Sequence, residues 1–284
     1  MFGRQSLKRT AGVALLLCAA CTATAASAVA GTPTGDFARF NQCPRFAEVS
    51  LPDEAGYCIY VKTFGGEVTV GRRVVPVARP IALVGGFMRH ENMEREFDSE
   101  PVFLAALNGE TLPRSPQPVP GGLFGMPLYV TLELIPPASD IELNVENLFN
   151  DHGSVAVLPV RLHLENQLLG SECYVGSRTQ PIVLHLTAAR TNPSPPNPPI
   201  SGEVGKVIFR DEYGLVEVLS NVLVDNTFAV PGADGCGGPG RASLVDAMVD
   251  GALDLPSPGG HNAIVEDNDI WDGSALSVIA SESG

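Results

Sequence analysis

Glycine and proline interrupt almost every stretch of this chain, which contains 30 glycines and 24 prolines among its 284 residues. Proline lacks the amide hydrogen that a helix interior or a central strand needs, and glycine favours turns. Regular structure is therefore limited to short segments joined by turns, which is typical of antiparallel β proteins. The hydrophobic content of 44 % is enough for a buried core. The sequence predicts an all-β fold, an antiparallel β-sandwich-like domain.

Several segments show the alternation expected for strands with one buried face. It is clearest over residues 154–165 and 181–187, where Val, Leu or Ile recurs at every second position. Residues 206–210 and 215–219 flank a short turn sequence and predict a hairpin. The Gly65-Gly66 pair lies between two β-forming segments and predicts another hairpin, because both residues of a tight turn need positive φ.

One segment near the C-terminus, residues 242–254, has a helical period instead. Ser243 and Asp246 have the spacing of a capping box, and Pro256 prevents the helix from continuing. The predicted apolar face consists of Leu244, Val245, Met248, Val249, Ala252 and Leu253. We therefore expect one short α-helix beside the β domain.

Residues 1–30 are organised like a secretory signal peptide. Its positive charges are those of Arg4, Lys8 and Arg9. An apolar run over 11–20 follows, and cleavage is expected after the small residues Ala28 or Ala30. This run is shorter than the roughly 20 residues of a membrane-spanning helix, and no similar run follows it, so no transmembrane segment is predicted in the mature protein. Lipidation at Cys21, which follows two alanines, is the alternative to ordinary cleavage.

Cleavage of this leader leaves four cysteines, and an even number in an exported chain predicts two disulfides. They are Cys43, Cys58, Cys173 and Cys236. Of the three possible pairings we favour Cys43–Cys58 and Cys173–Cys236, because each then joins residues within one half of the chain. A zinc site is the competing interpretation, but the chain has no Cys-x-x-Cys pair after the leader.

The mature chain is strongly acidic. Removing the three basic residues of the leader, and no acid, changes the formal net charge from −14 to −17. Such a chain repels nucleic acid and anionic lipid, and it has no cluster of Lys or Arg, so no nucleic-acid partner is expected. A cell-wall or other extracellular partner fits this balance.

Residues 191–200 are rich in proline and favour an extended, stiff conformation. They could divide two domains, but the preferred Cys173–Cys236 bridge would join the chain on both sides of them. We therefore predict one β-rich domain over residues 31–284, with 191–200 as a crossover within it.

Two groups of side chains are candidates for metal binding. His163, Glu165 and His185 would point from one sheet face if their strands were antiparallel neighbours. The run 266–273 is acidic, and Asp267, Asp269 and Asp272 resemble part of a calcium loop without its closing glutamate. In both cases ordinary solvated polar residues are the competing interpretation, and no cofactor is predicted.

The chain has no nucleophile elbow, no zinc-protease motif, no phosphate-binding loop and no dinucleotide fingerprint. We therefore expect a non-enzymatic surface, binding or structural module. An exported hydrolase that uses acidic residues is one alternative, and residues 89–98 and 112–127 would then cover a cleft with an acid pair or an acid–His pair. A calcium-stabilised adhesion module is the other alternative.

Several short pieces resemble a group of uncharacterised secreted proteins from high-GC Gram-positive, actinobacterial, species. The pieces are Cys58 with Gly65-Gly66-Glu67, and residues 108–112, 118–123, 173–177, 195–202 and 221–238. They are mainly turn, proline and cysteine positions. The resemblance implies export and a shared fold, and it transfers no site residue.

Overall fold

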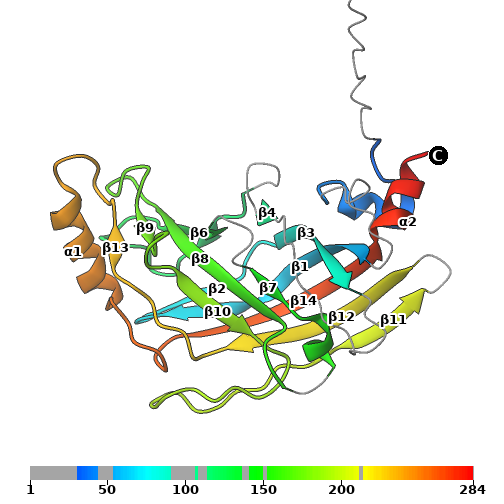
Figure 1. Cartoon of the computed structure of the whole chain (residues 1–284). Coiled ribbons are helices and arrows are strands. Elements are labelled where there is room, and N and C mark those ends of the chain that lie inside the picture. The colour runs from blue at the N-terminus through cyan, green and yellow to red at the C-terminus, as the bar shows by residue number, and fades with distance from the viewer. Residues whose placement is uncertain are drawn as a thin grey trace, which may run out of the picture. The chain divides into compact units, whose positions relative to one another are not determined.

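The strands of this protein form two antiparallel sheets whose inner faces share one apolar core (Figure 1). The computed structural model describes residues 31–43, 54–90, 106–107, 114–135, 141–149, 152–210 and 214–283. The predicted leader and most of the charged stretch 89–98 lie outside these residues. Within the described parts of the chain, the predicted all-β, sandwich-like fold is confirmed.

Each sheet is ordered by hydrogen bonding rather than by sequence. Sheet A runs β11 (Lys206–Arg210), β12 (Leu215–Asp225), β14 (Ala263–Ser274), β1 (Glu54–Val70), β3 (Ile81–His90) and β4 (Ala106–Leu107), and β2 (Arg73–Pro76) pairs with β1. Sheet B runs β13 (Ala233–Asp234), β9 (Tyr174–Val175), β8 (Ala156–Glu165), β6 (Tyr129–Leu134) and β5 (Gln117–Pro118), and β10 (Ile182–Leu186) and β7 (Glu142–Leu143) also pair with β8. The predicted hairpin around residue 212 is the β11–β12 pair, with Arg210 opposite Leu215.

The predicted hairpin at Gly65-Gly66 is wrong, because β1 continues through both glycines. The chain turns back only after Val70, which pairs with Arg73 of β2. The glycines instead follow a β-bulge, where the register of β1 against β14 shifts between Thr63 and Gly65. Gly66 has φ +101°, and a side chain there would collide with the carbonyl oxygen of Val265. Two glycines between β-forming segments indicate a bulge as readily as a turn.

The bulge decides which side chains of β1 face the core. Successive residues of a strand point to opposite faces, and one extra residue reverses that order. Ile59 and Val61 point inward before the bulge, and Val68 and Val70 point inward after it. Phe64, at the shift, is 43 % exposed. One strand thus lines the core on both sides of the bulge.

The principal core is made by both sheets, with Ile59 and Ile264 from sheet A and Val160 and Ile182 from sheet B. Each buried side chain of this size contributes about 1.5–3 kcal/mol by leaving water. The predicted inward row of β10 is confirmed, because Ile182, Leu184 and Leu186 are buried and His185 is exposed.

A second, smaller core covers the outer face of sheet A at one end. There the 3₁₀-helix η1 (Gly35–Phe40) and the short helix α2 (Ala275–Ala280) pack on Cys58 and Leu215. Helix α2 was not predicted, because six residues are too few to establish a helical period. The remaining short elements are the 3₁₀-helices η4 (Val145–Leu148) and η5 (Ser281–Ser283).

Helix α1 (Ala242–Leu253) confirms the predicted helix, but not its details. Only Val249 and Leu253 of the apolar face are buried, and Leu244 is 67 % exposed. The capping prediction is also wrong, because the N-cap residue is Arg241 and makes no side-chain cap. The carboxylate of Asp246 instead accepts a hydrogen bond from the loop that follows β13.

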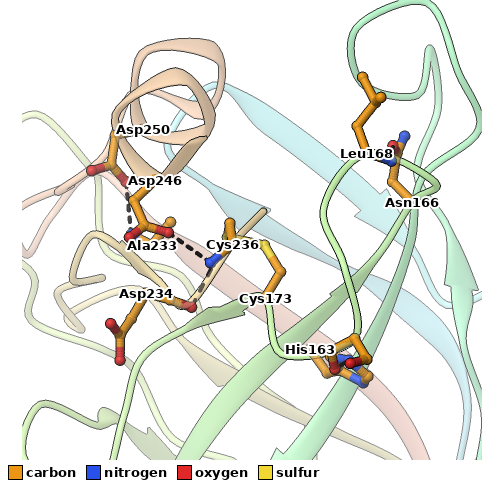
Figure 2. Close-up of a disulfide and its surroundings, with 10 residues drawn as sticks. His163, Asn166, Leu168, Cys173, Ala233, Asp234, Cys236, Asp246 and Asp250 are labelled. Carbon is orange, nitrogen blue, oxygen red and sulfur yellow. Dashed lines mark hydrogen bonds between the residues drawn. A yellow bond between two sulfur atoms is a disulfide. The ribbon is translucent and has the colours of Figure 1, made fainter. Parts of the chain in front are cut away.

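Both predicted disulfides, Cys43–Cys58 and Cys173–Cys236, are present. The second joins the end of β9 to the loop after β13, with 4.0 Å between the two Cα atoms. Asp246 accepts a hydrogen bond from the backbone N–H of Cys236, and Asp250 accepts one from Ala233 (Figure 2). The disulfide and the two helical carboxylates together fix α1 to the end of sheet B.

The proline-rich segment connects β10 of sheet B to β11 of sheet A, so it crosses between the sheets. The segment forms a loop whose two ends meet, and not the extended conformation expected from its prolines. The N–H of Thr191 donates to the carbonyl oxygen of Ile200 at 2.8 Å. Asn197 within it donates to the carbonyl oxygens of Asn226 and Asn262. Gly31–Gly284 forms one compact unit, which contains this segment.

Replacing Gly66 by Ala should destabilise the protein by more than about 2 kcal/mol, because the backbone there has positive φ and the new methyl group meets Val265. Gly251→Ala in α1 is the matched control, since a Cβ there meets nothing within 4 Å. It should stabilise by about 0.5–1 kcal/mol. Urea denaturation measures both, and equal effects would contradict the bulge geometry.

Candidate functional site

An apolar cavity lies between the two sheets. Its internal volume is about 70 Å³, and it is open to solvent on one side. Sheet A contributes Val68, Val70, Arg73, Val75, Pro76, Ile81 and Glu266, and sheet B contributes Gln117, Val130, Leu132, Leu162, Leu164 and Val175. Val77, Val119, Leu128 and Leu253 complete the lining. We refer to it as the intersheet cavity.

The sequence leaves this space open because of the residues that it places on the facing strands. Seven of the lining residues are valines, and packed sheets lie about 10 Å apart. Two short valine side chains do not fill that distance. Leu132 and Leu162, which are opposite each other on β6 and β8, therefore remain partly exposed although they line the cavity between the sheets.

Partly exposed apolar side chains inside a fold are informative, because burying them would stabilise the protein. A mostly apolar lining with a few polar groups is typical of small-molecule binding sites. The intersheet cavity meets this description, since Arg73, Gln117 and Glu266 are its only polar or charged lining residues among those that the structure describes.

Glu266 is the acidic group of the intersheet cavity. It lies on β14 opposite Gly66 of β1 and Leu223 of β12. Burial raises the pKa of its carboxyl from 4.5 to about 7, and a hydrogen bond from the Asn268 side chain opposes this change. A carboxyl group of this kind is mainly protonated in mildly acidic solution and can then donate a hydrogen bond.

Gln117 has a structural function. Its side-chain oxygen accepts hydrogen bonds from the backbone N–H groups of Ala78 and Arg79, both at 2.9 Å. Its amide nitrogen donates to the carbonyl oxygens of Arg79 and Ser115. Gln117 therefore joins the segment after β2 to β5 and has no capacity left for a ligand.

The sequence did not reveal Arg73 and Glu266 as cavity residues. Glu266 was interpreted as part of an acidic loop over 266–273, but this segment belongs to strand β14. A signal was present, because Ile264, Glu266, Asn268 and Ile270 occupy alternate positions and are all buried. The high content of acids obscured that alternation.

The proposed calcium-loop residues do not share one side of β14. Asp267 and Asp269 lie at odd positions of the strand and Asp272 lies at an even position, so they point to opposite faces. Asp269 accepts a hydrogen bond from the N–H of Ser220 at 2.9 Å. Trp271, on the same strand, is half-buried and packs against Tyr60 with 5.7 Å between the ring centroids.

The proposed cluster of His163, Glu165 and His185 is only partly assembled. His185 is paired with Val157 of β8, six residues from His163 along the same strand. Six residues of a strand span about 20 Å, so His185 cannot share an ion with His163. Within the described residues, no three His, Cys, Asp or Glu side chains form a group that could hold a metal ion.

His163 belongs instead to a polar hollow at one end of sheet B, which also contains Glu165 and Glu172. The ring of His163 stacks on Tyr174 at 4.8 Å, and Nε2 lies 3.0 Å from the carbonyl oxygen of Ser171. The other ring nitrogen, Nδ1, lies 3.6 Å from a carboxylate oxygen of Glu133. Nε2 is thus engaged by the protein, whereas Nδ1 is buried beside Glu133 without a hydrogen-bond partner among the described residues.

Arg161 completes this network of charges. It donates two hydrogen bonds to one oxygen of Glu133, at 2.8 and 3.0 Å, and its guanidinium lies 3.9 Å from the ring centroid of Tyr174. Burial raises the pKa of Tyr174, and Arg161 partly opposes this. The contacts hold β6, β8 and β9 together, so the network is a structural one.

A third hollow lies between η4 and sheet A, at the other end of β1 from Val68. Its lining includes Tyr57, Ile59, Phe149 and Phe209. Phe149 and Phe209 are 47 % and 65 % exposed. This hollow has an internal volume of about 260 Å³ and is slightly less open to solvent than the intersheet cavity, but a larger part of its lining is polar.

Comparisons of the chain with protein-family models, curated proteins and solved structures found no match. In the part of the chain that the structure describes, no helix is long and apolar enough to cross a membrane. The two disulfides fit an oxidising environment such as the cell exterior.

The raised pKa of Glu266 predicts a specific dependence of stability on pH. Between pH 4.5 and 7 the unfolded chain releases a proton that the folded protein retains, so this group lowers the free energy of unfolding as the pH rises, by about 3 kcal/mol in total. Glu266→Gln should remove that loss.

Urea denaturation at about pH 5 and about pH 8 measures the difference, with Glu67→Gln as the control because Glu67 is exposed on β1. The stability of Glu266→Gln relative to the native protein should increase from the lower to the higher pH. A difference that does not change with pH would show that Glu266 is solvated rather than buried.

Proposed function

We propose that this protein is an exported, non-enzymatic binding protein that holds a small apolar molecule in the intersheet cavity. The observation that carries the proposal is the partial exposure of apolar side chains such as Leu132 and Leu162 within the space between the sheets. A ligand would cover that apolar surface and would gain about 25 cal/mol for each Å² removed from water.

The construction of the cavity also favours binding over catalysis. Most of its lining residues lie on β-strands, so their positions are fixed by backbone hydrogen bonds. Of the residues expected to roof an enzymatic cleft, Gln117 and Val119 are part of the cavity wall. His163 lines the separate polar hollow, where Nε2 lies 3.0 Å from the carbonyl oxygen of Ser171, and the neighbouring Glu133 accepts hydrogen bonds from Arg161.

The leader-like residues 1–30, the acidic charge and the two disulfides support a secreted or envelope-associated location. A protein in that location can carry an apolar molecule through water, because the ligand is enclosed between the sheets. Membership of the secreted actinobacterial group that the chain resembles is part of this proposal. A cell-wall partner would then act as a source or an acceptor of the ligand.

Filling the intersheet cavity should abolish binding without unfolding the protein. In Leu132→Trp, and separately in Leu162→Trp, a large ring replaces a partly exposed side chain of the cavity wall. We expect the affinity for a neutral apolar fluorescent dye, N-phenyl-1-naphthylamine, to fall at least about tenfold in a fluorescence titration, which corresponds to about 1.4 kcal/mol.

Leu276→Trp is the matched control, because Leu276 on α2 is 73 % exposed and lies outside the cavity. Near-UV circular dichroism and thermal unfolding show that each variant is folded. Absence of dye binding by the native protein, or equal binding by folded Leu132→Trp and Leu276→Trp, would refute the proposal.

A further inference from the structure

Arg73 is the basic group of the intersheet cavity. It is the first residue of β2 and pairs with Val70, the last residue of β1. Alternate residues of β2 face the cavity, and both Arg73 and Val75 line it. The neighbouring Arg72 is directed elsewhere, because its guanidinium donates to the carbonyl of Gly251 and lies 3.6 Å from the carboxylate of Asp254.

The Nε atom of Arg73 is buried, and it has no hydrogen-bond partner among the described residues. A buried donor without an acceptor destabilises a protein, because it has lost its hydrogen bonds to water and gained none in return. Arg73 also forms no ion pair with any carboxylate that the structure describes, although the guanidinium group is always charged. The cavity thus contains a cation and a free donor for which this part of the chain provides no acceptor.

The guanidinium group of Arg73 lies close to the protein surface. Nη1 of Arg73 lies 3.5 Å from the place that a Cβ on Gly121 would occupy, and Gly121 is exposed. The group therefore extends from the buried Nε toward a turn at the protein surface. Valines and leucines line the interior beyond it. This order, charge near the surface and apolar walls inside, matches an amphiphile with its polar end outward.

The other ionisable group of the cavity does not neutralise Arg73. Glu266 pairs with Gly66, four residues from Val70 along β1, which corresponds to about 13 Å. Because burial raises the pKa of Glu266 to about 7, its carboxyl is mainly neutral in mildly acidic solution. The cavity then carries the net positive charge of Arg73.

We infer that the ligand is a long-chain amphiphile with an acidic head group, whose head binds Arg73 while its apolar chain occupies the intersheet cavity. This inference rests on the proposed function. A carboxylate or a phosphate provides two oxygens in the geometry of the guanidinium fork, and such charge-assisted hydrogen bonds are stronger than neutral ones.

The test compares three ligands of equal chain length: decanoate, decyl phosphate and methyl decanoate. Each displaces N-phenyl-1-naphthylamine from the native protein, from Arg73→Gln and from Arg72→Gln, at about pH 6, where Glu266 is mainly neutral. Arg72→Gln is the matched control, because it removes the same charge from the adjacent surface residue.

Arg73→Gln should bind at least one of the two acidic ligands at least about tenfold more weakly and should bind methyl decanoate with unchanged affinity. Arg72→Gln should resemble the native protein. Weakening of only one acidic ligand identifies the head group as a carboxylate or a phosphate. Equal affinities of Arg73→Gln and the native protein for both acidic ligands would overturn the inference.

The two proposals fail in different ways. If the dye itself does not bind the native protein, the proposed function is wrong. If dye and methyl decanoate bind but the acidic ligands do not depend on Arg73, the cavity binds apolar molecules and Arg73 is not an anchor. Unchanged binding of methyl decanoate by Arg73→Gln also shows that this variant is folded.

Discussion

The rest of the structure depends on the long antiparallel ladder between β1 and β14, and on the bulge within it. Because a strand reverses the direction of its side chains at every residue, the 17 residues of β1 could not otherwise present both Val61 and Val68 to the core. The bulge corrects the alternation at Phe64, and Gly66 permits the close approach of Val265. The wall of the intersheet cavity follows from that correction.

A cavity between sheets weakens a fold, because its lining loses van der Waals contacts and remains partly hydrated. A disulfide and two side-chain hydrogen bonds beside the intersheet cavity offset this loss of stability. The Cys173–Cys236 disulfide holds β9, and Asp246 and Asp250 hold α1 against the same loop (Figure 2). Leu253 at the end of α1 is itself part of the cavity lining. These cross-links thus border the space proposed to bind a ligand.

The polar side chains divide into those that serve the structure and those that face the cavity. Glu133, Arg161 and His163 interact with one another and with neighbouring strands, so their charges are compensated within sheet B. Arg73 and Glu266 lie in an apolar environment, where a charge or a donor interacts strongly with whatever enters. This difference in surroundings, rather than residue type, separates the candidate binding groups from the rest.

The sequence alone determined the fold class, the number of disulfides and the helix at 242–253, because these depend on local patterns and on the parity of four cysteines. It favoured the observed pairing, Cys43–Cys58 and Cys173–Cys236, over two others only because each bridge then lies within one half of the chain. Only the tertiary structure decided how Gly65-Gly66 and the acidic run at 266–273 are used. Gly65-Gly66 would suit a tight turn as well as a β-bulge. The acidic residues of 266–273 would suit a surface loop as well as a strand. Which one forms depends on the strand that pairs alongside, and β1 ends at Val70 whereas β14 begins only at Ala263.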